Sequence, residues 1–139
     1  MMGVRIFTQV ASDETAGRRL AAAIPSLWPE ISRKLAQRII RAGGCYLDGR
    51  RCHVPATMLA AGQRLRVCVD AGLPFREFHL DPASILFEDA SLLVVNKPSG
   101  VPVALSATGQ EGSVQLGVAE YLSARGPACR PAVIHRLDQ

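Results

Sequence analysis

The sequence contains no long apolar run, no Cys-x-x-Cys pair and no internal repeat. A membrane helix needs about 20 consecutive apolar residues, and no stretch of the 139 residues approaches that length. The first residues, Met1-Met2-Gly3-Val4-Arg5, show neither the apolar core nor the cleavage site of a secretory signal. We therefore expect a cytoplasmic protein with no membrane partner, long enough for one real core or for two small pieces.

The four cysteines are Cys45, Cys52, Cys68 and Cys129. Closed zinc sites use closely spaced ligand pairs, and none of these cysteines forms such a pair. His53 directly follows Cys52, which is not a zinc spacing either. We expect buried or half-buried free thiols in a reducing compartment, and no bound metal.

Positive charge is concentrated in the first half of the chain. Residues 1–70 hold 11 Lys and Arg against 5 Asp and Glu, a net charge of +6, whereas residues 71–139 hold 5 against 7, a net charge of −2. A basic half on an otherwise nearly neutral protein indicates a polyanionic partner, with nucleic acid ahead of a membrane surface. A solvated basic surface is the simpler alternative.

Apolar periodicity, caps and glycines predict mixed helices and strands. Ser12 begins the first predicted helix, which should run to about Ile24 and end before Pro25. The second predicted helix should end at the Gly43-Gly44 pair, because glycine easily adopts the left-handed conformation that ends a helix. Helices are thus expected at 12–24, 32–43 and 113–125, and strands at 3–10, 45–47, 50–54, 63–69, 85–87, 92–96 and 132–137. Asp48-Gly49 should form a tight turn, and residues 70–84 a linker.

The second predicted helix places its basic residues on one side. At about 100° per residue, its polar side chains fall within an arc of about 140°, and apolar residues fill the opposite arc. The arc consists of Arg33, Lys34, Gln37, Arg38 and Arg41. One helix can therefore pack on a core and present a phosphate-binding surface.

The order of elements in residues 12–69 resembles the alpha-L RNA-binding domain first described in ribosomal protein S-four. The most specific segments are Ser32-Arg33-Lys34-Leu35-Ala36-Gln37, Gly43 to Arg51 (Gly-Gly-Cys-Tyr-Leu-Asp-Gly-Arg-Arg) and Ala61-Gly62-Gln63-Arg64-Leu65. Asp48-Gly49 departs from the usual Asn-Gly and adds a negative charge to the turn. The resemblance implies that structured RNA is bound by the basic arc together with Arg50 and Arg51.

The second half resembles the start of the catalytic domain of the RluA-like pseudouridine synthases. The motifs are Ile85-Leu86-Phe87-Glu88-Asp89, the run from Leu92 to Gly100 that ends Asn-Lys-Pro-Ser-Gly, and His135-Arg136-Leu137-Asp138. The resemblance implies an α+β fold. A small alpha-L RNA-binding domain (1–69) and a linker (70–84) would precede the N-terminal part of a truncated, mixed α/β catalytic domain with a mainly antiparallel sheet (85–139).

This family converts specific uridines to pseudouridine in structured RNA. The resemblance implies that Asp138 is the catalytic residue, as nucleophile or as base, with Arg136 filling the space left by the flipped uridine and His135 fixing the loop. On a strand, Arg136 and Asp138 would share one face, so the guanidinium would keep the carboxylate ionised. We expect no cofactor, a monomer, and ribosomal large-subunit RNA as the partner. We also expect a chain that ends one residue after Asp138 to be inactive alone.

Two other function classes fit parts of the sequence. A non-catalytic RNA-binding adaptor would use the alpha-L domain alone. An aminoacyl-tRNA synthetase tail would carry a similar domain, but the Asn96-Lys97-Pro98-Ser99-Gly100 segment disfavours it. Lys97 itself could contact phosphate or serve the local loop structure.

Overall fold

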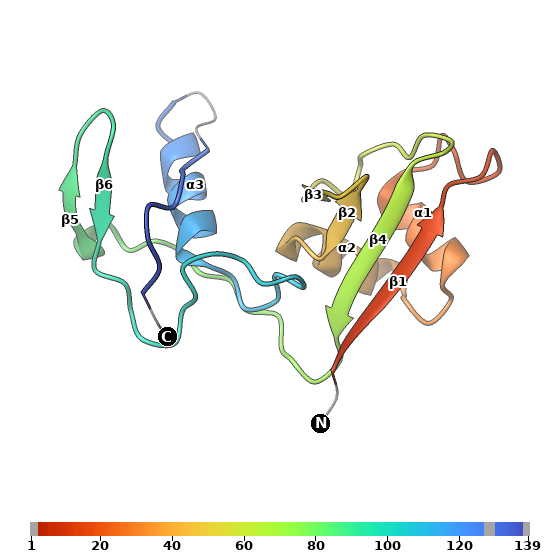
Figure 1. Cartoon of the computed structure of the whole chain (residues 1–139), viewed down its shortest axis with the longest axis horizontal. Helices are drawn as coiled ribbons and strands as arrows, with labels where there is room; N and C mark the ends of the chain where they lie inside the picture. Colours follow the sequence, from red (N-terminus) through yellow and green to blue (C-terminus); the bar gives the residue numbers. More distant parts are fainter. Residues whose placement is uncertain (1–2, 127–129, 138–139) are drawn as a thin grey trace. The chain divides into compact units, whose positions relative to one another are not determined.

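The computed structural model describes residues 3–126 and 130–137 (Figure 1). The chain divides into two compact units. The first comprises Met1–Phe75 with Ser106–Gln110, and the second comprises Arg76–Leu105 with Glu111–Gln139. Within the described residues, no helix is long and apolar enough to cross a membrane.

The first unit is a four-stranded antiparallel sheet with two helices on one face (Figure 1). Its elements are β1 (Val4–Val10), α1 (Leu20–Leu27), α2 (Arg33–Ala42), β2 (Cys45–Leu47), β3 (Arg50–Cys52) and β4 (Arg64–Asp70), and the strand order is β1-β4-β2-β3. The core lies between sheet and helices and includes Ile24, Ile39, Ile40, Leu65 and Val67, all fully buried. These elements bear out the predicted α+β class.

The second unit contains fewer regular elements. They are a single 3₁₀ turn η1 (Pro82–Ser84), the antiparallel hairpin β5 (Ile85–Glu88) and β6 (Leu93–Val95), and helix α3 (Val114–Ser123). Asp89 closes the hairpin, because its carboxylate accepts the backbone N–H groups of Ser91 and Leu92. The predicted strands at 85–87 and 92–96 and the helix after Ser113 are confirmed.

The prediction for the first helix was wrong at both ends. Thr15 donates its backbone N–H and its hydroxyl to the Ser12 carbonyl, which closes a turn rather than a helix. Gly17 then adopts φ +76°, a left-handed conformation that interrupts a right-handed helix. Helix α1 begins only at Leu20 and contains Pro25. Because proline removes an amide donor, it weakens the helix, which ends two residues later at Leu27.

The strand predicted at 132–137 is also absent from the described residues. Residues 130–137 adopt no regular structure, and none of the strands described pairs with them. A strand is stabilised by its ladder partner, so an apolar sequence alone does not form one.

Candidate RNA interface and the approach to the catalytic motif

Helix α2 is fixed at both ends by signals in its own sequence. The Ser32 hydroxyl accepts the backbone N–H of Leu35 at 3.2 Å, which caps the first turn. Gly43 adopts φ +96° and donates its N–H to the carbonyls at the end of the helix. Between these caps the apolar side, Ala36, Ile39 and Ile40, is fully buried. Because this side packs on the core, the opposite side of the helix faces solvent.

That other side carries the predicted basic arc. Arg33, Lys34, Arg38 and Arg41 are exposed, and Gln37 is half-buried. Arg38 also lies over the ring of Phe75, with 4.4 Å from Cζ to the ring centre. Within the described part of the first unit, the one ion pair is Arg5–Glu30, so no carboxylate neutralises the arc there. The arrangement leaves four cations available to an anionic ligand.

The β2–β3 hairpin adjoins the end of α2. Asp48 and Gly49 both adopt positive φ, 48° and 79°, so the predicted tight turn is confirmed. The Asp48 carboxylate accepts the backbone N–H of Arg64 at 2.9 Å, which ties the turn to β4. Arg50, the next residue, is exposed. The hairpin thus presents the exposed Arg50 side chain beside a turn whose acid is already hydrogen-bonded.

Arg51 has a different environment from Arg50. Its guanidinium donates to the Gly43 carbonyl and, at 2.9 Å, to the Ser106 carbonyl. His53 Nδ1 lies 3.1 Å from the Arg41 carbonyl. Arg51 therefore satisfies the carbonyl of Gly43 at the end of α2, although a guanidinium has five N–H donors and can still serve a further acceptor.

Residues 106–110 pack on the first unit, which no pattern in the sequence indicated. The Tyr46 hydroxyl donates to the Ala107 carbonyl at 2.8 Å. Gln110 is 1% exposed, and its amide bonds both the N–H and the carbonyl of Asp70 as well as the Leu73 carbonyl. A Cβ at Gly109 would overlap the Ala42 carbonyl, so only glycine allows this approach. We call residues 106–110 the docked segment.

The predicted catalytic motif is only partly described. His135 and Arg136 are exposed and lie in the segment without regular structure. Asp138 lies outside the described residues, and so does its expected placement on one strand face with Arg136. Their catalytic roles therefore stay predictions.

A cavity of about 650 Å³ in the second unit includes His135 in its wall. Most of its other walls are apolar, from β6, α3 and residues 130–137; Leu93, Val95, Val118 and Ile134 are examples. Lys97 also lines it, but the ammonium donates to the carbonyls of Val101 at 2.9 Å and Pro98 at 3.3 Å. Of the two predicted uses of Lys97, the local structural one is observed.

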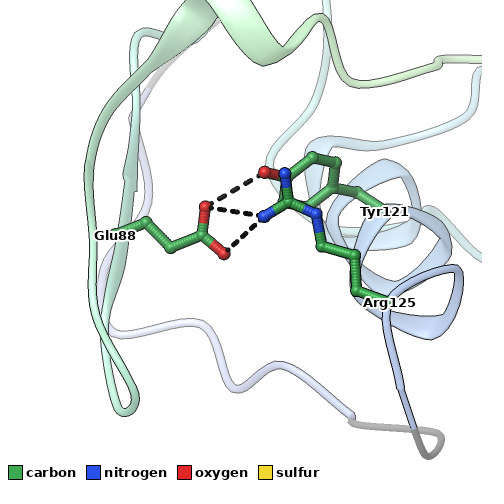
Figure 2. A network of polar contacts seen from close by, with 3 residues as sticks. All are labelled: Glu88, Tyr121 and Arg125. Carbon is green, nitrogen blue, oxygen red and sulfur yellow. Dashed lines mark hydrogen bonds and ion pairs between the residues drawn. The ribbon is translucent and has the colours of Figure 1, made fainter.

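A polar network joins the β5–β6 hairpin to α3 (Figure 2). The Tyr121 hydroxyl donates to the Glu88 carboxylate at 3.0 Å, and Arg125 forms an ion pair with that carboxylate at 3.2 Å. Arg125 also lies 4.2 Å from the centre of the Tyr121 ring. The pKa of Tyr121 is raised mainly by desolvation and, to a smaller extent, by the hydrogen bond to Glu88. These contacts fix the hairpin against the helix.

Three of the four cysteines lie in the described residues and are free thiols. Cys45 and Cys68 are buried and Cys52 is half-buried, as predicted; Cys129 lies outside the described residues. Burial raises the pKa of Cys45 to about 12, with smaller contributions from Cys52 and Cys68. Burial also raises the pKa of Cys68. Residues 3–126 and 130–137 contain no cluster of three or more His, Cys, Asp or Glu suited to a metal ion.

Known proteins similar to this chain are RNA-modifying enzymes by name. An uncharacterized RNA pseudouridine synthase of Synechocystis sp. is 30% identical over 132 residues, which covers 92% of this chain and 40% of the relative. The ribosomal large subunit pseudouridine synthase D of Xanthomonas campestris is 31% identical over 131 residues, 94% of this chain and 39% of the relative. The ribosomal large subunit pseudouridine synthase D of Salmonella typhimurium is 27% identical over 133 residues, which covers 95% of this chain and 41% of the relative.

The chain thus spans about two fifths of the length of the relatives that it matches. No family model matches it. The similarity nevertheless covers at least 92% of this chain in each of the three comparisons. Nearly the whole of this chain is therefore homologous to part of known RNA pseudouridine synthases, which supports the resemblance to the RluA-like family.

Proposed function

We propose that the whole protein isomerises uridines to pseudouridine in structured ribosomal RNA of the large subunit, in the cytoplasm. The first unit would hold the RNA through the basic arc and Arg50, and the His-Arg-Leu-Asp motif would supply the chemistry. The observation that carries the proposal is the set of exposed, unneutralised cations on α2 in a chain homologous to RNA pseudouridine synthases. The names of two relatives favour the large ribosomal subunit as target.

In the proposed reaction the glycosidic bond of a flipped uridine breaks, the uracil turns, and a carbon–carbon bond joins it to the ribose. Asp138 would attack the ribose or remove its proton, and Arg136 would occupy the vacated space in the RNA. His135 would fix the loop that carries both residues. The reaction is an isomerisation, so it consumes no oxidant and no activated group.

We further propose that the 139-residue chain binds RNA without turning it over. Its match leaves more than half of each relative outside the aligned part. The described part of the second unit has few fully buried apolar side chains, so residues beyond this chain would be needed to enclose a uracil pocket.

The test compares this chain with the whole protein on transcribed large-subunit RNA. Pseudouridine is measured by carbodiimide treatment and primer extension, and RNA binding is measured by filter retention. We expect binding by both and modification by the whole protein alone. Binding by the whole protein without modification of any transcript would instead favour the non-catalytic adaptor.

A further inference from the structure

The outer face of the first unit's sheet carries a tyrosine with two arginines across it. Tyr46 of β2 pairs with Arg51 of β3 and with Arg66 of β4 in the strand registers. Directly opposite residues in antiparallel strands share one face of the sheet. The Cζ atoms of Arg51 and Arg66 lie 4.9 Å and 4.3 Å from the centre of the Tyr46 ring. The neighbours of Arg66 in β4, Leu65 and Val67, point into the core instead.

The two arginines differ in how many of their N–H donors are already used. Arg51 already donates to two backbone carbonyls. Arg66 is exposed, its guanidinium lies by the Tyr46 ring, and among the described residues it forms no ion pair or side-chain hydrogen bond. The ring restrains the guanidinium on one side, while the Arg66 side chain as a whole is exposed. A restrained planar guanidinium on an exposed side chain suits bidentate contact with a phosphate.

This position continues the basic arc of α2. His53 and Arg51 bond carbonyls at the end of that helix, at Arg41 and Gly43, so the hairpin adjoins the arc. The Tyr46 ring contacts the guanidinium groups of both Arg51 and Arg66. Positive charge therefore runs from the helix, past its C-terminal end, onto the outer sheet face.

Three carboxylates of the first unit are already engaged. Asp48 accepts the backbone N–H of Arg64, and Asp70 accepts that of Gly72. Glu30 pairs with Arg5. We propose that the RNA-binding surface extends onto this outer sheet face and that Arg66, held by the Tyr46 ring, contacts a phosphate of the bound RNA. The inference rests on the proposed function, because it assumes that the first unit binds RNA.

The experiment measures binding of the 139-residue chain to a large-subunit RNA transcript by filter retention over a range of salt concentrations. Arg66→Gln should weaken binding severalfold and lower the slope of log affinity against log salt by about 0.7–0.9, the value of one lost phosphate contact. Arg5→Gln is the matched control. Arg5 lies on the opposite face of the sheet, pairs with Glu30 and should leave the slope unchanged.

Arg38→Gln, on the α2 arc, separates this inference from the proposed function. A lower slope for Arg38→Gln with an unchanged slope for Arg66→Gln would overturn the extension alone. Unchanged slopes in both would overturn RNA binding by this unit as well. An equal loss in Arg5→Gln would show that only total charge matters and would also overturn the assignment of Arg66.

A folding control accompanies each variant. Trp28, the only tryptophan, lies in the first unit and packs 5.4 Å from the Phe7 ring, so its fluorescence reports whether this unit is folded. Arg66→Lys keeps the charge without the planar group and provides a variant less disturbing to the sheet surface. It should keep the wild-type salt slope with weaker binding, and a lost slope in this variant would contradict a phosphate contact.

Discussion

Gln110 forms a reciprocal pair of hydrogen bonds with the backbone of Asp70, 40 residues earlier in the chain. Its side-chain oxygen accepts the Asp70 N–H at 2.7 Å, and its side-chain nitrogen donates to the Asp70 carbonyl at 2.9 Å. The same nitrogen also donates to the Leu73 carbonyl. The amide thus continues the hydrogen bonding of β4 where the strand ends, as a neighbouring strand would. This anchors the docked segment to the first unit.

The first prediction is that Gln110→Ala destabilises the first unit by about 1–3 kcal/mol, the cost of leaving a buried N–H without a partner. Gln110→Glu should cost more, because a carboxylate would face two carbonyl oxygens. Urea unfolding followed by Trp28 fluorescence measures both. Gln9→Ala is the control, since Gln9 is exposed and bonds only the adjacent Val10 carbonyl. Equal midpoints for the Gln110 variants and wild type would show that the hydrogen bonds of the Gln110 amide contribute nothing to stability.

Local signals accounted for the parts of the fold that the sequence predicted. Ser32 and Gly43 cap the two ends of α2 through hydrogen bonds to residues three or four positions away. Asp48 and Gly49 form their turn through their own backbone conformations. The prediction failed where partners are distant in sequence. A run such as 132–137 is apolar enough for a strand, but its pairing depends on a partner that local sequence does not specify.

The candidate site divides in the same way. The basic arc follows from helical periodicity, and its four cations are exposed as the wheel requires. The sequence did not single out Arg66 as a candidate site residue, because alternation in β4 shows only that its side chain points away from the core. Its contact with Tyr46 depends on the register between β2 and β4. The buried Gln110 had no sequence signal at all, since glutamine is ordinarily exposed.

The second prediction concerns the basic arc as a whole. Replacing Arg33, Lys34, Arg38 and Arg41 together by Gln should weaken binding to structured RNA and flatten its salt dependence by about 0.7–0.9 per lost contact. Glutamine is a good helix former and these side chains are exposed, so helix content by circular dichroism should change little. An unaltered affinity and salt slope in a correctly folded variant would remove the arc from the RNA interface.

The third prediction is that the buried thiols resist alkylation. The thiolate is the reactive form, and burial raises the pKa of both Cys45 and Cys68. At pH 8 both should stay protonated and inaccessible, whereas half-buried Cys52 should react first among these three. Peptide mass spectrometry after brief iodoacetamide treatment gives the order, with urea-unfolded protein as the control in which all react. Early modification of Cys45 in folded protein would contradict its burial.

The fourth prediction tests the network in Figure 2. Besides desolvation, which is the largest cause, the hydrogen bond and the negative charge of Glu88 raise the pKa of Tyr121, because both favour the protonated hydroxyl. Glu88→Ala should therefore lower that pKa toward the ordinary value for tyrosine, so the ring titrates at lower pH. NMR of ¹³C-labelled tyrosine resolves Tyr121 from Tyr46, which serves as the internal control. A Tyr121 titration that does not move in this variant would mean that the contact with Glu88 does not persist in solution.

The last prediction separates chemistry from binding in the whole protein. Asp138→Asn keeps the size of the side chain and removes the ionised oxygen that either proposed role requires. Pseudouridine formation on large-subunit RNA should fall to background, while the dissociation constant for that RNA should stay near the wild-type value, because the proposed RNA contacts lie in the first unit. Arg33→Gln in the same protein is the opposite case. It should weaken RNA binding and leave the rate at saturating RNA nearly unchanged. Full turnover by the Asp138→Asn enzyme would exclude this carboxylate from the reaction, and a large loss of binding in that variant would assign it to RNA recognition instead.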